Sequence, residues 1–182
     1  MNKNLKSKLL PVSLSVIIVI LDQLTKWLVV KNIAVRTQVI SIFGKYVQLI
    51  HVRNKGVAFS FMDGLPDTAR SLILGIIPLI IIVLIYFFMF KGNEFTNFQR
   101  WVICGILGGG IGNIIDRLFR PDGVVDFISC YFFGIFGMEY WPTFNVADCA
   151  VVVCGILFLI SFIFQSKGKV ENQAEKDESS AN

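Results

Sequence analysis

Four long apolar stretches determine which architectures this chain of 182 residues can adopt. A helix needs about 20 apolar residues to cross roughly 30 Å of hydrocarbon. The stretches that approach this length are residues 9–30, 71–90, 101–119 and 146–164. The chain is also 54% hydrophobic and only 16% charged, which is far more apolar than a soluble domain. The sequence therefore predicts an integral membrane protein with four transmembrane helices.

The positive charges favour one orientation of these spans. Lys3, Lys6 and Lys8 precede the first span as in a secretory signal, but no small-x-small cleavage site follows, so we interpret this span as an uncleaved anchor. An even number of crossings places both termini on one side of the membrane. Lysines and arginines divide almost evenly between the two sides, so their total does not decide the orientation. The N-terminal lysines and the short connection with Lys91 and Arg100 favour cytoplasmic termini.

The long connection between the first two spans predicts a small β-structure. Residues 39–43 and 46–52 are rich in strand-forming residues and flank the turn pair Gly44-Lys45, which is typical of a hairpin. We expect this hairpin at the membrane surface. Residues 123–141 are aromatic and interrupted by glycines, and they are too broken for a fifth crossing. We interpret them as a connection that partly dips into the membrane interface.

The end of the chain has a different composition from the spans. After Gln165 the sequence is polar and charged, which predicts disorder. We therefore divide the chain into one membrane domain, residues 1–165, and a cytoplasmic tail, residues 166–182.

Asp126 and Asp148 each lie at the edge of a very apolar segment. Asp126 stands between Val124-Val125 and Phe127-Ile128, and Asp148 lies at the start of the fourth span. Desolvating an ionised carboxylate costs several kcal/mol, about 2.5–3.5 on insertion scales at mid-bilayer, so such residues are rarely kept without a use. If the two converge, like charges disfavour double ionisation, and one acid and one base remain at neutral pH. Amide hydrolysis needs this combination.

The third span combines small residues with a polar face. Gly105 with Gly109, and Gly108 with Gly112, are two small-xxx-small pairs that let helix backbones approach closely. Three polar residues follow on one helical face, because they are spaced i, i+3 and i+4: Asn113, Asp116 and Arg117. An alternative that stays open is that Asp116 and Arg117 merely neutralise each other.

Other charged residues also have structural interpretations. Asn145 can cap the fourth helix, and Asp148 then takes the third helical position, where the helix dipole favours an anion. For this reason we predict that Asp148 ionises more readily than Asp126. Asp22 and Lys26 lie four residues apart in the first span with the acid first, and we interpret them as an ion pair.

Several kinds of site are not expected. His51 is the single histidine, and there is no HExxH motif or Cys/His cluster, so we expect no metal ion and no cofactor. The cysteines lack CxxC pairing and are expected to be free thiols. The net charge of +4 is scattered along the chain, so we expect no binding of nucleic acid.

The residues alone leave other classes of protein open. Membrane carboxylates also mark ion pathways, as in a small transporter or proton channel, although the chain has no inverted repeat. A non-catalytic scaffold would use the same charges only to pair. Among peptidases, the Asp-Thr/Ser-Gly signature of soluble aspartic proteases and the Gly-x-Gly-Asp motif of presenilin-like ones are both missing.

Five motifs together resemble those of the bacterial lipoprotein signal peptidases, also called signal peptidase II. In chain order they are Asp22-Gln23-x-Thr25-Lys26, Asn54-x-Gly56-x-Ala58-Phe59, Gly112-Asn113-x-x-Asp116-Arg117, Val125-Asp126-Phe127 and Phe144-Asn145-x-Ala147-Asp148. Each motif is weak alone, but this order within four apolar spans is specific, and it covers roughly residues 9–165. The resemblance implies an aspartyl endopeptidase of the inner membrane that cuts prolipoproteins just before the diacylglyceryl-modified cysteine.

The resemblance also implies a fold and roles for single residues. The fold would be four transmembrane helices with a small extracytoplasmic β-cradle between the first two, so the active site would lie near the extracytoplasmic face. Asp126 and Asp148 would be the catalytic pair. Polar groups lining the site would be Asn54, Asn113, Arg117 and Asn145, and supporting positions would be Asp22, Lys26, Gly56 and Asp116. The expected partners are prolipoprotein substrates and membrane lipid, and we expect a monomer.

Overall fold

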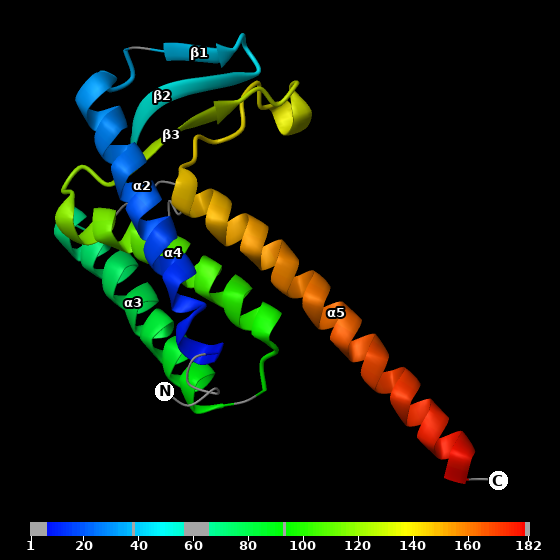
Figure 1. Cartoon of the computed structure of the whole chain (residues 1–182). Helices are drawn as coiled ribbons and strands as arrows, with labels where there is room; N and C mark the ends of the chain where they lie inside the picture. Colours follow the sequence, from blue (N-terminus) through cyan, green and yellow to red (C-terminus); the bar gives the residue numbers. More distant parts are fainter. Residues whose placement is uncertain (1–6, 38, 57–65, 93, 181–182) are drawn as a thin grey trace.

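The computed structural model describes residues 7–37, 39–56, 66–92 and 94–180. In this part of the chain, four helices are long and apolar enough to cross a membrane, over Ser7–Asn32, Leu72–Lys91, Asn97–Phe119 and Val146–Gln165. They confirm the predicted spans. The corresponding helices in Figure 1 are α2 (Val12–Asn32), α3 (Asp67–Lys91), α4 (Asn97–Phe119) and α5 (Val146–Ser180).

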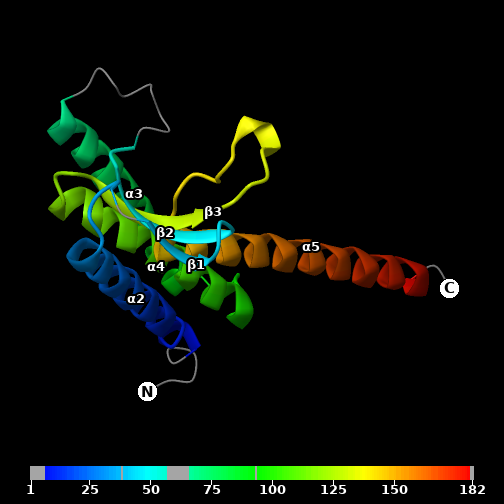
Figure 2. The same ribbon diagram turned by 90° about the horizontal axis from the view of Figure 1, so that it is seen from above.

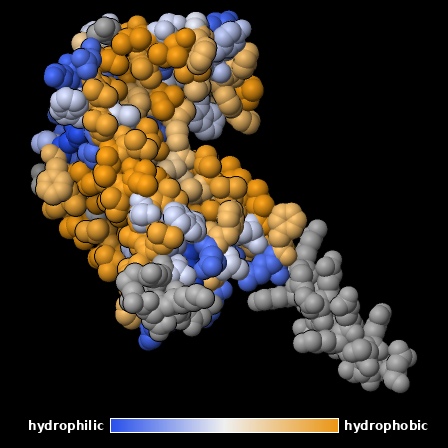
Figure 3. All heavy atoms as spheres, in the orientation of Figure 1, coloured by the Kyte–Doolittle hydropathy of each residue, from blue (hydrophilic) through white to orange (hydrophobic). Residues whose placement is uncertain are grey.

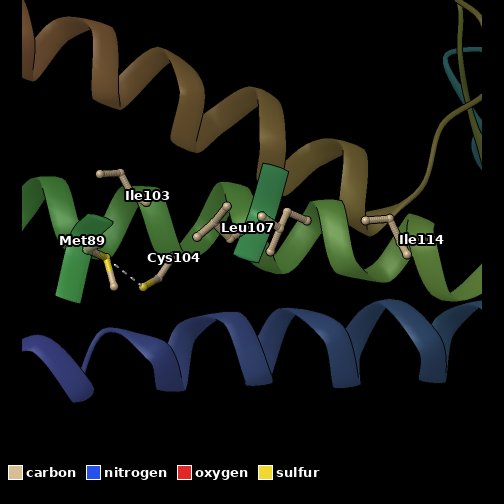
Figure 4. Close-up of a cluster of buried hydrophobic side chains, with 6 residues drawn as sticks. Met89, Ile103, Cys104, Leu107 and Ile114 are labelled. Carbon is tan, nitrogen blue, oxygen red and sulfur yellow. Dashed lines mark hydrogen bonds between the residues drawn. The ribbon is translucent and has the colours of Figure 1, made fainter. Parts of the chain in front are cut away.

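α4 is the central helix of the bundle. It contacts α2, α3 and α5, and Figure 4 shows it between α2 and α5. A buried apolar cluster of α3 and α4 side chains forms the core: Ile82, Met89, Ile103, Cys104, Leu107 and Ile114. α4 begins at Asn97 rather than at the predicted Trp101, because Thr96 caps it. The Thr96 hydroxyl accepts a hydrogen bond from the Gln99 N–H at 3.2 Å, and the Gln99 side chain accepts one from the Thr96 N–H at 3.0 Å.

The two glycine pairs of α4 face two different helices. A methyl group on Gly108 would lie 2.7 Å from the Ser15 Cα in α2, whereas one on Gly109 would collide with the Ala147 carbonyl oxygen in α5. Gly105 likewise approaches Cys154 of α5. The offset of the pairs therefore allows one helix to pack closely on two neighbours at once.

We expect Gly109→Ala to destabilise the protein by about 1–3 kcal/mol, the usual cost of overpacking. The added methyl group meets α5 backbone at Ala147, beside Asp148, rather than the end of a flexible side chain. Gly155→Ala is the matched control, because a methyl group at Gly155 meets nothing within 4 Å. Thermal unfolding in detergent measures both variants. Equal losses of stability would show that the close approach at Gly109 is not what matters.

A three-stranded antiparallel sheet lies beyond one end of the helices (Figures 1 and 2). Its order is β1 (Val39–Phe43), β2 (Val47–Asn54) and β3 (Val124–Cys130). The predicted hairpin between the first two spans is present as β1 and β2. β3 is an addition that the sequence reading missed, since we interpreted residues 123–141 as a connection. An isolated hairpin is marginally stable, so pairing with β3 is what completes the sheet.

β3 ties the sheet to the bundle. Val125 and Phe127 are buried and pack against Val29 and Ile33 at the end of α2. Asp126, between them, is paired in register with Val52 of β2. The apolar neighbours thus fix the strand, and the alternation of side chains directs Asp126 to the opposite face of the sheet.

The chain between β3 and α5 forms a short arm. Residues 131–141 fold back on themselves through a bridge between Tyr131 and Tyr140, with a 3-10 turn, η2 (Ile135–Gly137), at the tip. α5 then runs away from the bundle and continues to Ser180, so its backbone is helical in the segment for which composition predicts disorder. The division of the chain at residue 165 stays a prediction.

Candidate active site

The fold brings Asp126 and Asp148 into one hydrogen-bonded network. Asp126 comes from β3, and Asp148 lies in the first turn of α5. Asn145 contacts both carboxylates: its side-chain Nδ2 donates to Asp126 Oδ1 at 2.7 Å, and its backbone N–H donates to Asp148 Oδ2 at 3.1 Å. Two acids that are distant in the sequence are therefore bridged by a single residue.

Asn145 also caps α5. Its side-chain Oδ1 accepts a hydrogen bond from the Asp148 N–H at 3.0 Å, and with the bond from the Asn145 N–H to Asp148 this makes a reciprocal capping arrangement. The predicted cap at Asn145 is therefore confirmed, and it is compatible with a role of the same residue beside the carboxylates. The cap uses the oxygen of the amide, so the Nδ2 group remains available for Asp126.

Asn113 connects Asp148 to the charged interior. Its Nδ2 donates to Asp148 Oδ1 at 2.7 Å. Its Oδ1 accepts from Lys26 Nζ at 2.9 Å and from Asn145 Nδ2 at 3.0 Å. Because an ammonium group can only donate, Lys26 fixes which end of the Asn113 amide is the oxygen. The nitrogen must then face Asp148.

Asn54 supports Asp126 from β2 in the same way. Its Nδ2 donates to Asp126 Oδ2 at 2.9 Å, while its Oδ1 accepts from the Gly56 N–H at 2.9 Å. Gly56 has φ +86, a conformation that favours glycine, and a side chain there would meet Leu74 at 2.7 Å. The backbone at Gly56 thus sets the orientation of the Asn54 amide.

A fully buried cluster of charged side chains, the charged centre, adjoins this network through Lys26. Lys26 Nζ is 2.8 Å from Asp22 Oδ2 and 3.1 Å from Asp116 Oδ2, and all three side chains are 0% exposed. Asp116 also pairs with Arg120 at 3.0 Å, and Gln23 donates to Asp116 at 3.1 Å. The ion pair expected between Asp22 and Lys26 is present, with a second acid added to it.

The two acids of this centre hold the backbone beside each site carboxylate. Asp22 Oδ1 accepts a hydrogen bond from the Ala147 N–H at 3.0 Å, and Asp116 Oδ2 accepts one from the Val125 N–H at 3.0 Å. Ala147 immediately precedes Asp148, and Val125 immediately precedes Asp126. The charged centre therefore fixes the separation of β3 and α5 next to the two carboxylates.

The alternative in which Asp116 and Arg117 merely neutralise each other is wrong. The ion pairs of Asp116 are with Lys26 and Arg120. The charge of Arg117 interacts most strongly with Asp148 and then with Asp126, and Asp116 comes last. Arg117 also lines a small cavity with Asn54 and Gly123, and so adds a positive charge beside the carboxylate pair.

The environment of Asp126 favours its protonated form. The pKa of Asp126 is raised to about 6, chiefly by burial and also by the charge of Asp148. Hydrogen bonds from Asn54 and Asn145 and the charge of Lys26 act in the opposite direction, but burial prevails. Asp126 therefore keeps its proton to a higher pH than an exposed aspartate does.

An apolar groove begins at Asp148 and follows α5. It has a volume of about 530 Å³ and is lined by Trp141, Pro142, Thr143, Phe144, Asp148, Cys149, Val152 and Val153. Figure 3 shows the corresponding hollow between the upper lobe of the molecule and the start of α5. Val152 and Val153 are 58% and 55% exposed, so the groove opens on the side of α5 that faces lipid. An apolar chain lying along α5 would have one end beside a carboxylate.

The sequence reading missed some members of the site. Gln23 and Arg120 were not candidates, although Gln23 is adjacent to Asp22 and Arg120 lies four residues after Asp116, which is a usable signal for an ion pair on a helix. His51, the single histidine, is buried, and its Nδ1 lies 2.8 Å from the Ile33 carbonyl oxygen. Among the described residues, no group of three or more His, Cys, Asp or Glu side chains could hold a metal ion.

The fold and the site together define a multi-pass membrane protein with one buried and one half-buried carboxylate in a shared hydrogen-bonded network at one end of its helix bundle. The family model described as signal peptidase (SPase) II matches residues 14–164. The chain belongs to this family, and it is therefore a membrane-bound protease of the signal-peptide-processing class.

Individual proteins show the same relationship. The lipoprotein signal peptidase of Treponema pallidum is 48% identical over 162 residues, which cover 89% of this chain and 87% of that protein. The lipoprotein signal peptidase of Borrelia hermsii is 48% identical over 148 residues, covering 81% and 86%. A bacterial membrane enzyme solved by the in meso method at 1.9 Å resolution has a TM-score of 0.70 and 28% identity, covering 84% of this chain and 91% of that one.

Proposed function

We propose that this protein is an aspartyl endopeptidase that cleaves diacylglyceryl-modified prolipoproteins immediately before the lipidated cysteine. The observation that carries the proposal is the bridge from Asn145 to both carboxylates, at 2.7 Å and 3.1 Å, at the start of an apolar groove. A protease of this family needs an acid and a base at the scissile amide, and a lipid-modified substrate needs an apolar surface beside them.

The two carboxylates would divide the proton transfers between them. Asp148 accepts hydrogen bonds from Asn113 and from the Asn145 N–H at the start of a helix, and these contacts orient its carboxylate as the base. Asp148 takes a proton from the attacking water, while Asp126 gives its proton to the carbonyl oxygen of the substrate. Asp148 then passes its proton to the leaving amine, and Asp126 recovers one from the tetrahedral intermediate. No covalent enzyme intermediate is required.

The polar neighbours would orient the substrate without reacting. Arg117 has a planar guanidinium group that suits carbonyl oxygens, and its charge already lies near both carboxylates. Asn113 and Asn145 are committed to Asp148 and Asp126, so their main effect is to hold the pair in place. Positioning of this kind supplies much of the rate of a reaction between bound groups.

The groove along α5 would hold the acyl chains of the substrate. Its lining is almost entirely apolar, and each methylene group that leaves water contributes at most about 0.8 kcal/mol. If the termini are cytoplasmic, as the N-terminal lysines favour, the sheet and the site would lie near the extracytoplasmic face. The enzyme would act as a monomer in the inner membrane.

We expect the purified protein to cleave a diacylglyceryl-modified precursor at least about tenfold faster than the same precursor with a free cysteine thiol, because only the former fills the groove. Mass spectrometry of the products gives both the rate and the cut position. A matched pair of variants, Val153→Asp in the groove and Ile163→Asp farther along α5, separates groove binding from a general effect of charge on α5. Equal cleavage of the two precursors, or a cut elsewhere than before the cysteine, would overturn the proposal.

A further inference from the structure

The arm between β3 and α5, residues 131–141, exposes an apolar tip that the proposed catalysis does not use. Five consecutive residues, 133–137, are exposed. Phe136 is 88% exposed and Phe133 is 67% exposed, and Ile135 lies between them. Large apolar side chains grouped in this way at the end of a protruding segment indicate a surface that contacts another apolar phase.

Backbone hydrogen bonds and ring contacts hold the base of the arm, so its tip has a defined position. The Phe132 N–H donates to the Glu139 carbonyl at 2.7 Å, and the Trp141 N–H donates to the Cys130 carbonyl at 2.8 Å. The centroid of the Tyr131 ring lies 5.5 Å from that of Tyr140 and 4.9 Å from that of Phe133.

Both exposed phenylalanines of the tip have a backbone conformation that is costly for a bulky residue. Phe133 has φ 57 and Phe136 has φ 54, in the left-handed region that bulky residues rarely occupy. Backbone strain of this kind is concentrated at functional positions such as ligand clamps and switch regions.

The position of the arm and its few charged residues indicate what surrounds the tip. Figures 1 and 2 show the arm projecting sideways from the sheet, past the helices. Trp141, at its base, also lines the groove that opens on the lipid side of α5, so the apolar surface is continuous from the spans to the arm. Within residues 131–141, Glu139 is the only Asp, Glu, Lys, Arg or His. Aromatic residues with few charges are characteristic of the headgroup layer of a bilayer.

We propose that the tip of the arm, Phe133, Ile135 and Phe136, is embedded in the phospholipid headgroup layer beside the groove that leads to Asp148. The arm thereby holds the sheet at a fixed height over the membrane on the side from which a lipid-borne substrate reaches the groove. Lys45, whose Nζ lies 4.4 Å from the centre of the Tyr131 ring, places a positive charge next to the arm, where lipid phosphates lie.

Tryptophan fluorescence tests the depth of the tip in the full protein reconstituted into phosphatidylcholine vesicles. The variants are Phe136→Trp and, as the matched control, Asp122→Trp, which stands in the exposed turn before β3. The spectrum of the wild type, with its native tryptophans, is subtracted. We expect lipids brominated near the headgroup end of the acyl chain to quench the added fluorescence at position 136 about twofold, and that at position 122 little.

Each result decides the proposal. Quenching at position 136, strongest for the shallow bromines and with emission shifted to shorter wavelength, supports it. Emission like that of position 122 without quenching would place the tip in water and overturn it. A shift to shorter wavelength without quenching by any brominated lipid would also overturn it, because the tip would then be covered by protein, such as a second copy of the chain.

Discussion

Asp126→Asn is expected to lower the cleavage rate about a thousandfold and to remove most of the dependence of stability on pH between pH 4 and pH 7. The first effect follows from the loss of the proposed general acid, since such a group contributes about 10²–10⁴ to the rate of a proton-transfer reaction. Asparagine keeps the shape of the side chain and one acceptor, but it cannot give up a proton. Single-turnover cleavage of a lipidated precursor measures the rate.

The second effect follows from the raised pKa of Asp126. The carboxyl loses its proton near pH 3.8 in the unfolded chain but near pH 6 in the folded protein, so the folded state binds more protons between these values. Stability must then fall as pH rises from about 4 to about 6, and it levels off above that. A difference of about two pKa units corresponds to about 3 kcal/mol, and Asp126 is only 2% exposed, so solvent screening removes little of it.

The pH dependence separates this effect from other consequences of the substitution. Asparagine leaves Asn54 or Asn145 without one of its acceptors, which lowers stability by a similar amount at every pH and does not alter the slope. Asp122→Asn, at an exposed position, is the control that should keep the wild-type slope. An unchanged slope in Asp126→Asn would show that Asp126 is ionised in the folded protein above pH 4.

Periodicity and hydropathy predicted the helices because crossing a membrane requires long apolar segments. The same reasoning failed for β3, where Asp126 is located. Val124 to Phe127 are all buried, so the alternation that marks a strand with one face in water is missing. A short apolar run of this kind does not differ from a loop or a helix start until its partner strand is known.

The spacing of residues along the sequence predicted part of the polar network and missed the rest. The pairing of Asp22 with Lys26 and the cap at Asn145 are contacts within one turn of helix, so sequence spacing predicts them. The contact of Asp116 with Lys26, and that of Asn145 with Asp126, depend on how two elements pack. The motif resemblance placed these residues in one site, but which atoms donate and accept required the structure.

Lys26→Met is expected to destabilise the protein by about 3–5 kcal/mol and to abolish measurable cleavage. Methionine fills a similar volume, but it leaves Asp22 and Asp116 buried with one positive charge fewer between them. Removing one partner of a buried ion pair costs this much, because the remaining charge is not compensated. Chemical unfolding in detergent measures the loss.

Stability alone does not show whether Lys26 also positions the active site, and a double variant does. In Asp22→Asn with Lys26→Met, Asp116 keeps Arg120, and an asparagine oxygen at position 22 still accepts the Ala147 N–H. Charge is then balanced, and we expect most of the lost stability to return. Asn113 still lacks the stronger, charged donor to its oxygen, so its Nδ2 is held toward Asp148 only through the bond from Asn145.

Cleavage by the double variant should therefore remain about a hundredfold below that of the wild type, the cost of a displacement of about 1 Å in a reacting group. The loss should appear in kcat more than in KM, since the groove along α5 is unchanged. A double variant that regains both stability and kcat would show that Lys26 only neutralises buried acids. Regained stability without regained kcat would show that the Lys26 ammonium group positions the site. It would do so through its hydrogen bond to the Asn113 oxygen, at 2.9 Å, because it donates no hydrogen bond to Asp126 or Asp148 in the described structure.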